Sequence, residues 1–413
     1  MLYSEVVWRV IMRQKFNEYC EIISGFAFKS KDLLSEGDIP VIKIGNISNG
    51  GDVILNDNTQ YVTDDFWTIN EKYHIKKGDI LISLTGSHIN QPNSMVGRTC
   101  RSYSDKKYLL NQRAGKIISK SNVDSNYMYY LFSSQAIKEN IVARAYGAAN
   151  QVNVSPTAIG NIKWDFPEKI QQEKMGGFLR LFDELIQNNI KRMKLLEQVA
   201  ENLYKEWFVR FRFPGYEKNE FEEKCPKGWT CKNKESMFIP TNWHYGELRE
   251  LGEFIRGRNI TIGNMIEGDV PVISAGISPS GYHNAANVLG ECITISSSGA
   301  NAGYLLYHLD DIWAADCSYY QNAKNLLFVY NSLKFLQPVI SNMQAGAAQP
   351  HVYPKHVNRI CVIIPEEKWI NRYCEVVRPI YNEIKTLKKK NENFMKQRDL
   401  LLPRLMSGKL EVK

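Results

Sequence analysis

Residues 168–208 have the apolar periodicity of one long helix of about 40 residues. Apolar side chains recur there at alternating intervals of four and three, the heptad pattern by which one helix packs against another. Fully helical, the stretch would be roughly 60 Å long, which is more than a compact domain needs for its own core. The predicted seam contains Leu179, Phe182, Ile186, Leu196 and Leu203.

The same seam recurs 198 residues further along the chain. Its members there are Val377, Ile380, Ile384, Leu387, Phe394 and Leu401. Two seams in one register predict that the two helices pair as a coiled coil. The alternative is two unrelated amphipathic helices, each packed on its own domain.

A wider internal repeat argues against that alternative. The segment 267–273 matches 36–42, and Gly346-Ala347-Ala348 matches Gly147-Ala148-Ala149. The offset between copies falls from 231 to 198, so the second copy has lost about thirty residues in loops. The sequence therefore predicts an α+β protein of two β-rich domains and two long helices. The expected parts are 1–166, the helix 167–213, a linker and second domain 214–365, and the helix and tail 366–413.

Strand and helix patterns can be placed within this plan. Strands are expected at 38–44, 78–84 and 154–166, a helix at 126–140, and a polar linker at 215–243. Two interior glycines, Gly176 and Gly177, predict either a kink early in the first long helix or a helix that begins near Phe178.

Composition describes an ordinary globular chain. No window approaches 18 uninterrupted apolar residues, so no membrane span and no membrane partner are expected. The eight cysteines are scattered, and we interpret them as reduced thiols in a cytoplasmic protein. Of the net charge of +8, the helical segments 168–212 and 366–413 carry +2 and +5. Such weakly charged globular parts indicate that any nucleic acid is bound with help from partners.

Motifs for catalysis are missing. No phosphate-binding loop occurs, because Gly115-Lys116 lacks the leading glycine, and His351 and His356 lack partners for a metal site. The Glu-x-Lys pattern in Glu222-Glu223-Lys224 lies in a charged, solvated segment. We therefore expect a non-catalytic protein that binds no metal or cofactor itself.

The loops between framework strands instead indicate recognition. They are rich in Asn, Gln, Arg, Ser and Tyr, which suit base edges and phosphates. Candidate DNA-binding residues in the first copy are Ser87, His88, Asn90, Asn111, Gln112 and Arg113. Those in the second copy are Arg256, Arg258, Ser274, Tyr282, His283, Asn284, Ser297, Asn301, Tyr320 and Gln321. Ordinary surface loops would have similar compositions, but variation of the same loops on one repeated framework favours binding.

At this point the chain resembles the specificity subunits of type I restriction–modification systems. The resemblance rests on the repeat order and on the segments 203–209, 346–352 and 398–408. It covers nearly the whole chain. The first copy departs from it at 150–153, where the Gln-Pro pair is absent.

The resemblance implies a function. Each target recognition domain would read one half of a split double-stranded DNA target, and the two helices would form an antiparallel coiled coil that sets the gap. Two modification subunits would dock on this scaffold and methylate adenine with S-adenosylmethionine, and restriction subunits would add translocation and cleavage driven by ATP and Mg²⁺.

Two other interpretations stay open from the residues alone. One is a tandem scaffold that bridges two protein partners without nucleic acid, with the basic helices as a solvated face. The other is an unfamiliar enzyme, which the motif search disfavours.

A length change in both helices tests their expected role as a ruler. Seven residues inserted after Asn189 and seven after Leu387 would lengthen each helix by about 10 Å and keep the seam facing its partner. At about 3.4 Å per base pair, the unspecified middle of the methylated motif should grow by about three base pairs. Sequencing of methylated sites in cells measures this. An active lengthened variant that keeps the original spacing would show that the helices do not set it.

Overall fold

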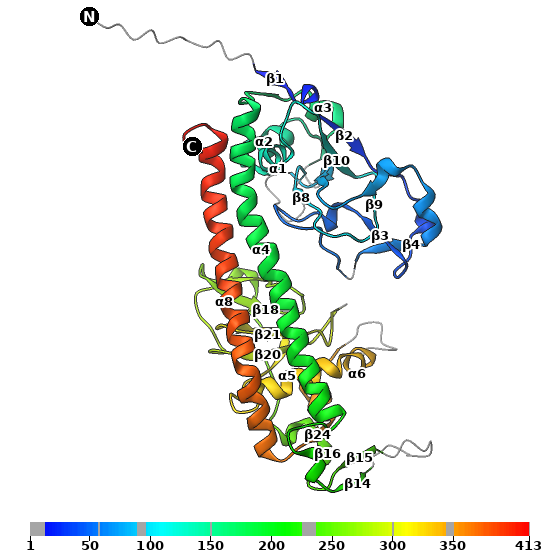
Figure 1. The fold of residues 1–413 in the computed structure, drawn as a ribbon, viewed down its shortest axis with the longest axis vertical. Coiled ribbons are helices and arrows are strands. Elements are labelled where there is room, and N and C mark those ends of the chain that lie inside the picture. Colours follow the sequence, from blue (N-terminus) through cyan, green and yellow to red (C-terminus); the bar gives the residue numbers. More distant parts are fainter. Residues whose placement is uncertain are drawn as a thin grey trace, which may run out of the picture. The chain divides into compact units, whose positions relative to one another are not determined.

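The structure is a computed structural model, which describes residues 13–56, 58–88, 96–148, 151–224, 237–299, 301–343 and 351–412. The chain forms two compact units (Figure 1). Unit 1 comprises residues 1–188 and 391–413, and unit 2 comprises residues 189–390. Each unit therefore combines one globular domain with a segment of both long helices. In the described parts of the chain, no helix is long and apolar enough to span a membrane.

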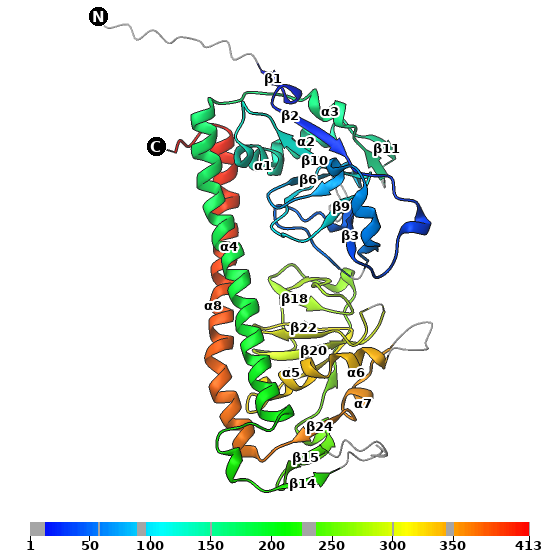
Figure 2. The same cartoon turned by 45° about the vertical axis from the view of Figure 1, so that its right-hand side comes forward.

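The two long helices are α4 (Lys169–Tyr204), which continues into a π-helical turn (Lys205–Val209), and α8 (Glu367–Met406). They run side by side in both views (Figure 1, Figure 2). α4 begins at Lys169 and runs through its glycine pair, so the alternative that the helix begins near Phe178 was wrong. A Cβ on Gly176 would lie 2.5 Å from the backbone nitrogen of Tyr127. Glycine at this position allows α4 to approach another helix closely.

The helices are antiparallel within each unit. In unit 1, the side-chain amide of Asn391 donates to the carbonyl of Ile186 at 3.4 Å, and the rings of Phe182 and Phe394 lie 6.3 Å apart. In unit 2, Arg192 pairs with Glu383 at 2.9 Å. As residue numbers rise along one helix, those of its contacts fall along the other. The predicted antiparallel coiled coil is confirmed.

None of the eleven seam residues is exposed. Leu179, Ile186, Val377, Ile384 and Leu387 are buried. Phe182, Leu196, Leu203, Ile380, Phe394 and Leu401 are partly buried.

The domain of unit 1 has two four-stranded sheets. One has the order β2-β10-β6-β8, with β2 Cys20–Ser24, β10 Ala114–Ser119, β6 Ile80–Ser83 and β8 Thr99–Arg101. The other has the order β4-β3-β9-β5, with β4 Gln60–Val62, β3 Ile39–Ile42, β9 Tyr108–Leu110 and β5 His74–Ile75. Smaller strands are β1 Gln14–Lys15, β7 Thr85–Gly86, β11 Tyr146–Ala148, β12 Gln151–Asn153 and β13 Lys163–Trp164. The helices are α1 Ser125–Ser133, α2 Gln135–Val142 and α3 Pro156–Gly160.

The domain of unit 2 has a similar arrangement, with one four-stranded and one three-stranded sheet. Figure 2 labels β18, β20 and β22 of these sheets. Its larger sheet has the order β17-β23-β20-β21, with β17 Ile255–Arg256, β23 Cys317–Tyr320, β20 Cys292–Ser296 and β21 Leu305–His308. Its smaller sheet has the order β19-β18-β22, with β19 Gly281–His283, β18 Val270–Ile273 and β22 Trp313–Ala314. The other strands are β14 Phe221–Lys224, β15 Met237–Pro240, β16 His244–Glu247 and β24 Cys361–Ile364. The helices are α5 Leu326–Phe335, α6 Gln337–Asn342 and α7 Pro354–Val357.

Corresponding backbone contacts confirm the internal repeat. β3 and β9 pair in parallel in unit 1, and β18 and β22 pair in parallel in unit 2. Directly after β2, a Cβ on Gly25 would lie 2.3 Å from the carbonyl oxygen of Leu110, and directly after β17, one on Gly257 would lie 2.5 Å from that of Ala315. Only glycine permits this approach, so the repeated glycine is a framework requirement.

Three local predictions were wrong in detail. The helix expected at 126–140 is two helices, because α1 ends before Ser134, whose hydroxyl bonds the carbonyl of Leu131 at 2.6 Å. The strand expected at 154–166 is α3 followed by the short strand β13, since Ser155 caps a helix that starts at Pro156. The linker expected at 215–243 contains the antiparallel pair of β14 and β15.

A buried ion pair joins the helices in unit 1. Arg398 of α8 donates to Asp183 of α4 at 2.6 Å, and their side chains are only 11% and 5% exposed. Tyr130 of α1 donates to the same carboxylate at 2.7 Å, and Arg398 also donates to the carbonyl of Gly50 at 3.2 Å. Burial opposes the charge on Arg398, but Asp183 and then Asp399 outweigh it and raise the pKa of the guanidinium. The network thus connects both helices to the domain.

The equivalent positions in unit 2 hold uncharged side chains. The repeat offset of 198 places Tyr381 at the equivalent of Asp183 and Ala200 at the equivalent of Arg398. The side-chain amide of Asn331, in α5, donates to the hydroxyl of Tyr381 at 3.1 Å. The hydroxyl of Tyr373 donates to the carbonyl of Ala200 at 3.0 Å. The two sets of contacts, which we call joints, therefore share positions but differ in chemistry.

A buried seam position and an exposed neighbour on α8 allow a matched test of the helix pair. Ile384→Asp should lower the free energy of unfolding by about 3–5 kcal/mol, because it places an uncompensated carboxylate in the seam. Lys389→Asp, on the exposed face of the same helix, should change it by less than about 1 kcal/mol. Chemical denaturation of both variants measures the difference. Similar losses in the two would mean that the helices do not depend on each other.

Candidate nucleic-acid interface

In unit 2, the end of the parallel strand pair gathers several loops. β18 and β22 run in the same direction, so their carboxyl ends meet at one edge, and the amide of Ala315 donates to the carbonyl of Ile273 at 2.8 Å. Ser274 follows directly on one strand and Asp316 lies just beyond the other. In open α/β sheets, loops at the carboxyl ends of parallel strands commonly bind ligands.

Two further segments reach the same place. The amide of Ser297 donates to the carbonyl of Asp316 at 3.2 Å, and that of Val352 donates to the carbonyl of Ser297 at 3.0 Å. Arg258 donates its amide to the carbonyl of Ala314 at 2.9 Å. We call residues 256–258, 274–275, 297–298, 315–316 and 351–356 the unit 2 loop cluster.

The unit 2 loop cluster is basic and aromatic at its surface. Arg256, Arg258, His351, Lys355 and His356 are all exposed. The rings of His351 and Tyr353 stack with their centroids 5.5 Å apart. Basic side chains suit phosphates and base edges, and aromatic rings offer stacking surfaces. Within the described residues, Ser297 Oγ and Asn301 Oδ1 are buried without a hydrogen-bond partner.

Unit 1 builds the equivalent edge from β3 and β9. The amide of Asn111 donates to the carbonyl of Ile42 at 3.0 Å, and the amide of Leu84 donates to the carbonyl of Arg113 at 3.0 Å. By these matching bonds, Arg113 occupies the place of Asp316 and Leu84 that of Ser297. We call residues 24–26, 43, 84–87, 111–113 and 153–155 the unit 1 loop cluster.

Different side chains fill this second edge. Lys43 stands where unit 2 has Ser274, and its ammonium donates to the side-chain carbonyl of Gln60. Burial, and next the nearby Arg113, lowers the pKa of Lys43. The hydroxyl of Thr85 donates to the side-chain oxygen of Asn153 at 2.7 Å. The two clusters thus have one backbone plan and separate surface chemistry.

The structure brings together some of the residues expected from the sequence. Asn111, Gln112, Arg113 and Ser87 lie in the unit 1 loop cluster, and Gln112 and Arg113 are exposed while Asn111 and Ser87 are buried. His88, partly buried, follows directly, and Asn90 lies outside the described residues. Arg256, Arg258, Ser274 and Ser297 lie in the unit 2 loop cluster, and Asn301 lies in the hairpin turn that follows Ser297.

Other expected residues lie elsewhere in unit 2. His283 is buried and pairs with Val270 at the start of β18, the end opposite Ser274; Tyr282 and Asn284 beside it are exposed. Gln321, also exposed, lies at the far end of β23 and its side chain donates to the carbonyl of Leu289. Tyr320 was a wrong choice, because it is only 1% exposed and its hydroxyl donates to the carbonyl of Leu251 at 2.8 Å.

Sequence reasoning missed several members of the clusters. Lys43, Asp316, Tyr353 and Lys355 were not among the candidates, and His351 and His356 were considered only as metal ligands. The signal for Lys43 was its place directly after a buried strand. The others become neighbours only through the fold, because their segments are far apart in the chain.

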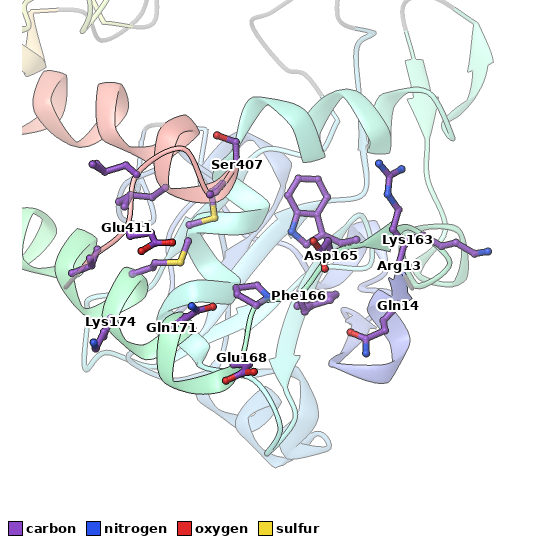
Figure 3. Close-up of a pocket in the computed structure, with 18 of the residues that line it drawn as sticks. Arg13, Gln14, Lys163, Asp165, Phe166, Glu168, Gln171, Lys174, Ser407 and Glu411 are labelled. Atoms are coloured by element: carbon purple, nitrogen blue, oxygen red, sulfur yellow. The ribbon is translucent and has the colours of Figure 1, made fainter. Parts of the chain in front are cut away.

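A separate open cleft of about 970 Å³ lies in unit 1, between the start of α4, the segment around β13 and the C-terminal residues 405–412. Its polar side chains do not converge, since Lys163 and Arg13 lie on one side and Lys174 and Glu411 on the other (Figure 3). Among the residues that the structure describes, no group of three or more His, Cys, Asp or Glu could hold a metal ion. The loop clusters remain the better candidate sites.

Comparison with known proteins gives one consistent family. The model of the type I restriction modification DNA specificity domain matches residues 12–199 and again residues 240–393. The MjaIX type I specificity subunit of Methanocaldococcus jannaschii is 25% identical over 316 residues, 73% of each chain. The putative MjaX specificity subunit of the same organism is 21% identical and covers 94% of this chain and 88% of its own.

A solved structure shares the fold. The crystal structure of the type I restriction–modification S subunit from M. genitalium aligns over 97% of both chains with a TM-score of 0.50 and 18% identity. The two family matches together cover most of the chain, and each match includes one of the loop clusters. The chain therefore belongs to the family of type I restriction–modification DNA specificity subunits.

Proposed function

We propose that this chain is the non-catalytic subunit that reads a two-part DNA target through its two loop clusters. The observation that supports this most is the pairing of one backbone plan with different side chains at equivalent positions. Lys43 corresponds to Ser274 and Arg113 corresponds to Asp316. Two readers built this way would bind DNA in the same manner and prefer different bases.

Partner subunits would supply the reaction. In this proposal two modification subunits bind S-adenosylmethionine and methylate adenine, and restriction subunits use ATP and Mg²⁺, all in the cytoplasm. Residues 213–365, the second globular part, carry a net charge of −2. Neutralised phosphates provide most of the sequence-independent affinity for DNA. A domain of this charge would therefore depend on its partner subunits for much of its affinity for DNA.

The exposed apolar pair Leu195 and Val199, on the part of α4 that belongs to unit 2, is the docking face that we propose for a modification subunit. Leu181 and Leu185 of unit 1 are exposed, as are Leu195 and Val199 of unit 2, which are 61% and 54% exposed. They repeat at heptad spacing on a face distinct from the buried seam. Exposed apolar pairs of this kind favour packing by a further helix. The equivalents on α8 are polar or Pro: Pro379, Glu383, Asn393 and Gln397.

Charges on this pair should break the docking. Leu195→Glu combined with Val199→Glu should lower the affinity for the modification subunit by 100-fold or more, about 3 kcal/mol, because carboxylates would be desolvated in the contact. Gln198→Glu, an exposed position between them, is the matched control and should keep the affinity. Co-purification and titration of the modification subunit measure the effect. If the double variant assembles normally, docking occurs on another face.

Exchange of one domain tests the two-reader function. β16 and β24 pair and close the domain of unit 2, so residues 215–365 can be replaced by the corresponding segment of another family member. The methylated motif should change in one half only, and the unit 1 half should stay the same. Sequencing of methylated DNA from cells that carry the exchanged chain gives the result. A change in both halves would contradict independent reading.

A further inference from the structure

Arg256 is held in place more tightly than the other exposed cations of the unit 2 loop cluster. It ends β17, the edge strand of the larger sheet, opposite Ser318 of β23. One guanidinium nitrogen donates to Asp316 Oδ1 at 3.0 Å, and the guanidinium carbon lies 5.3 Å from the ring centroid of Tyr353. The side chain is nevertheless 42% exposed.

The carboxylate that holds Arg256 is itself fixed. The hydroxyl of Ser298 donates to Asp316 Oδ2, while Arg256 uses Oδ1. Ser298 is in turn bridged to His351 through the backbone. Within the described residues, no acceptor other than Asp316 is bonded to the guanidinium, so most of its five N–H donors point elsewhere.

This arrangement favours a base over a phosphate. Asp316 offsets the charge of Arg256, which weakens its attraction for the DNA backbone. The guanidinium of Arg256 still presents its planar, fork-like set of N–H donors. Because Asp316 and Tyr353 already hold the side chain in one conformation, little side-chain entropy is lost on binding. Guanine presents two acceptors, O6 and N7, on its major-groove edge, which match such a fork; adenine presents a donor beside its N7 and would repel it.

Unit 1 lacks this device. In the matching strand pair, Ser24 lies opposite Gly115 as Arg256 lies opposite Ser318, so Ser24 occupies the place of Arg256. Arg113 occupies the place of Asp316, as the matching backbone bonds show. The two equivalent positions therefore hold Ser24 and Arg113 in unit 1, a hydroxyl and a cation. In unit 2 they hold Arg256 and Asp316, a cation and a carboxylate.

We infer that Arg256, oriented by Asp316 and Tyr353, reads a guanine in the half-site of unit 2. This rests on the proposed function and names one base of that half-site. Asp316 is a positioning residue in this scheme, because it acts through the guanidinium.

The test uses the full chain assembled with its modification subunits and a DNA library in which the unit 2 half-site is randomised. Arg256→Lys keeps the charge and removes the planar fork. It should reduce the preference for guanine at one position by about 10-fold or more, and Asp316→Asn should reduce it at that same position to a lesser degree. Preferences at the other positions and in the unit 1 half-site should stay unchanged.

A matched control is available in the same unit. Arg249 also pairs with a carboxylate, with its Nε 2.6 Å from Glu247, but lies outside the loop cluster, and Arg249→Lys should leave every preference unchanged. Thermal unfolding of each variant checks that it is folded.

Three outcomes would overturn the inference: a wild-type half-site without guanine on either strand, an unaltered motif in Arg256→Lys, or a uniform loss of methylation at all sequences. The last would indicate that Arg256 supports binding at every sequence and does not select a base. Failure of the proposed function looks different, because the wild-type chain would then direct no sequence-specific methylation at all.

Discussion

The buried ion pair between Asp183 and Arg398 is the contact on which the geometry of unit 1 depends. It is buried between the two helices beside the seam residues, and removal of either partner would leave an uncompensated buried charge that costs about 3–5 kcal/mol. Hydrogen bonds from Tyr130 and to Gly50 tie the same pair to the domain. One set of contacts therefore fixes the register of two helices and the seating of a domain on them.

The backbone explains how two readers can differ without losing the fold. Gly25, after β2, and Gly257, after β17, allow the backbone to approach the carbonyl oxygens of Leu110 and Ala315 closely. The parallel pairs β3–β9 and β18–β22 determine where the loops leave the sheet. These requirements concern main-chain atoms. The side chain can consequently be Arg113 in one cluster and Asp316 in the other, while the backbone carbonyl of each still accepts the equivalent hydrogen bond.

The two helices and the two domains could be predicted from the sequence because periodic patterns indicate both. Heptads located both helices, and the repeat located both domains, since hydrophobic periodicity depends on neighbours within one or two turns. The same reasoning failed for Tyr320, because a polar aromatic residue at a strand end fits a surface loop and a core equally well. It also missed the link between Arg256 and Asp316, which are 60 residues apart and meet only through strand pairing.

The unlike joints have a consequence for moving a domain from one position of this chain to the other. A domain transferred from the second position to the first would bring Asn331 to the place of Tyr130, against a buried carboxylate that also needs Arg398. Domains exchanged between the two positions of this chain would therefore meet helix residues of different chemistry.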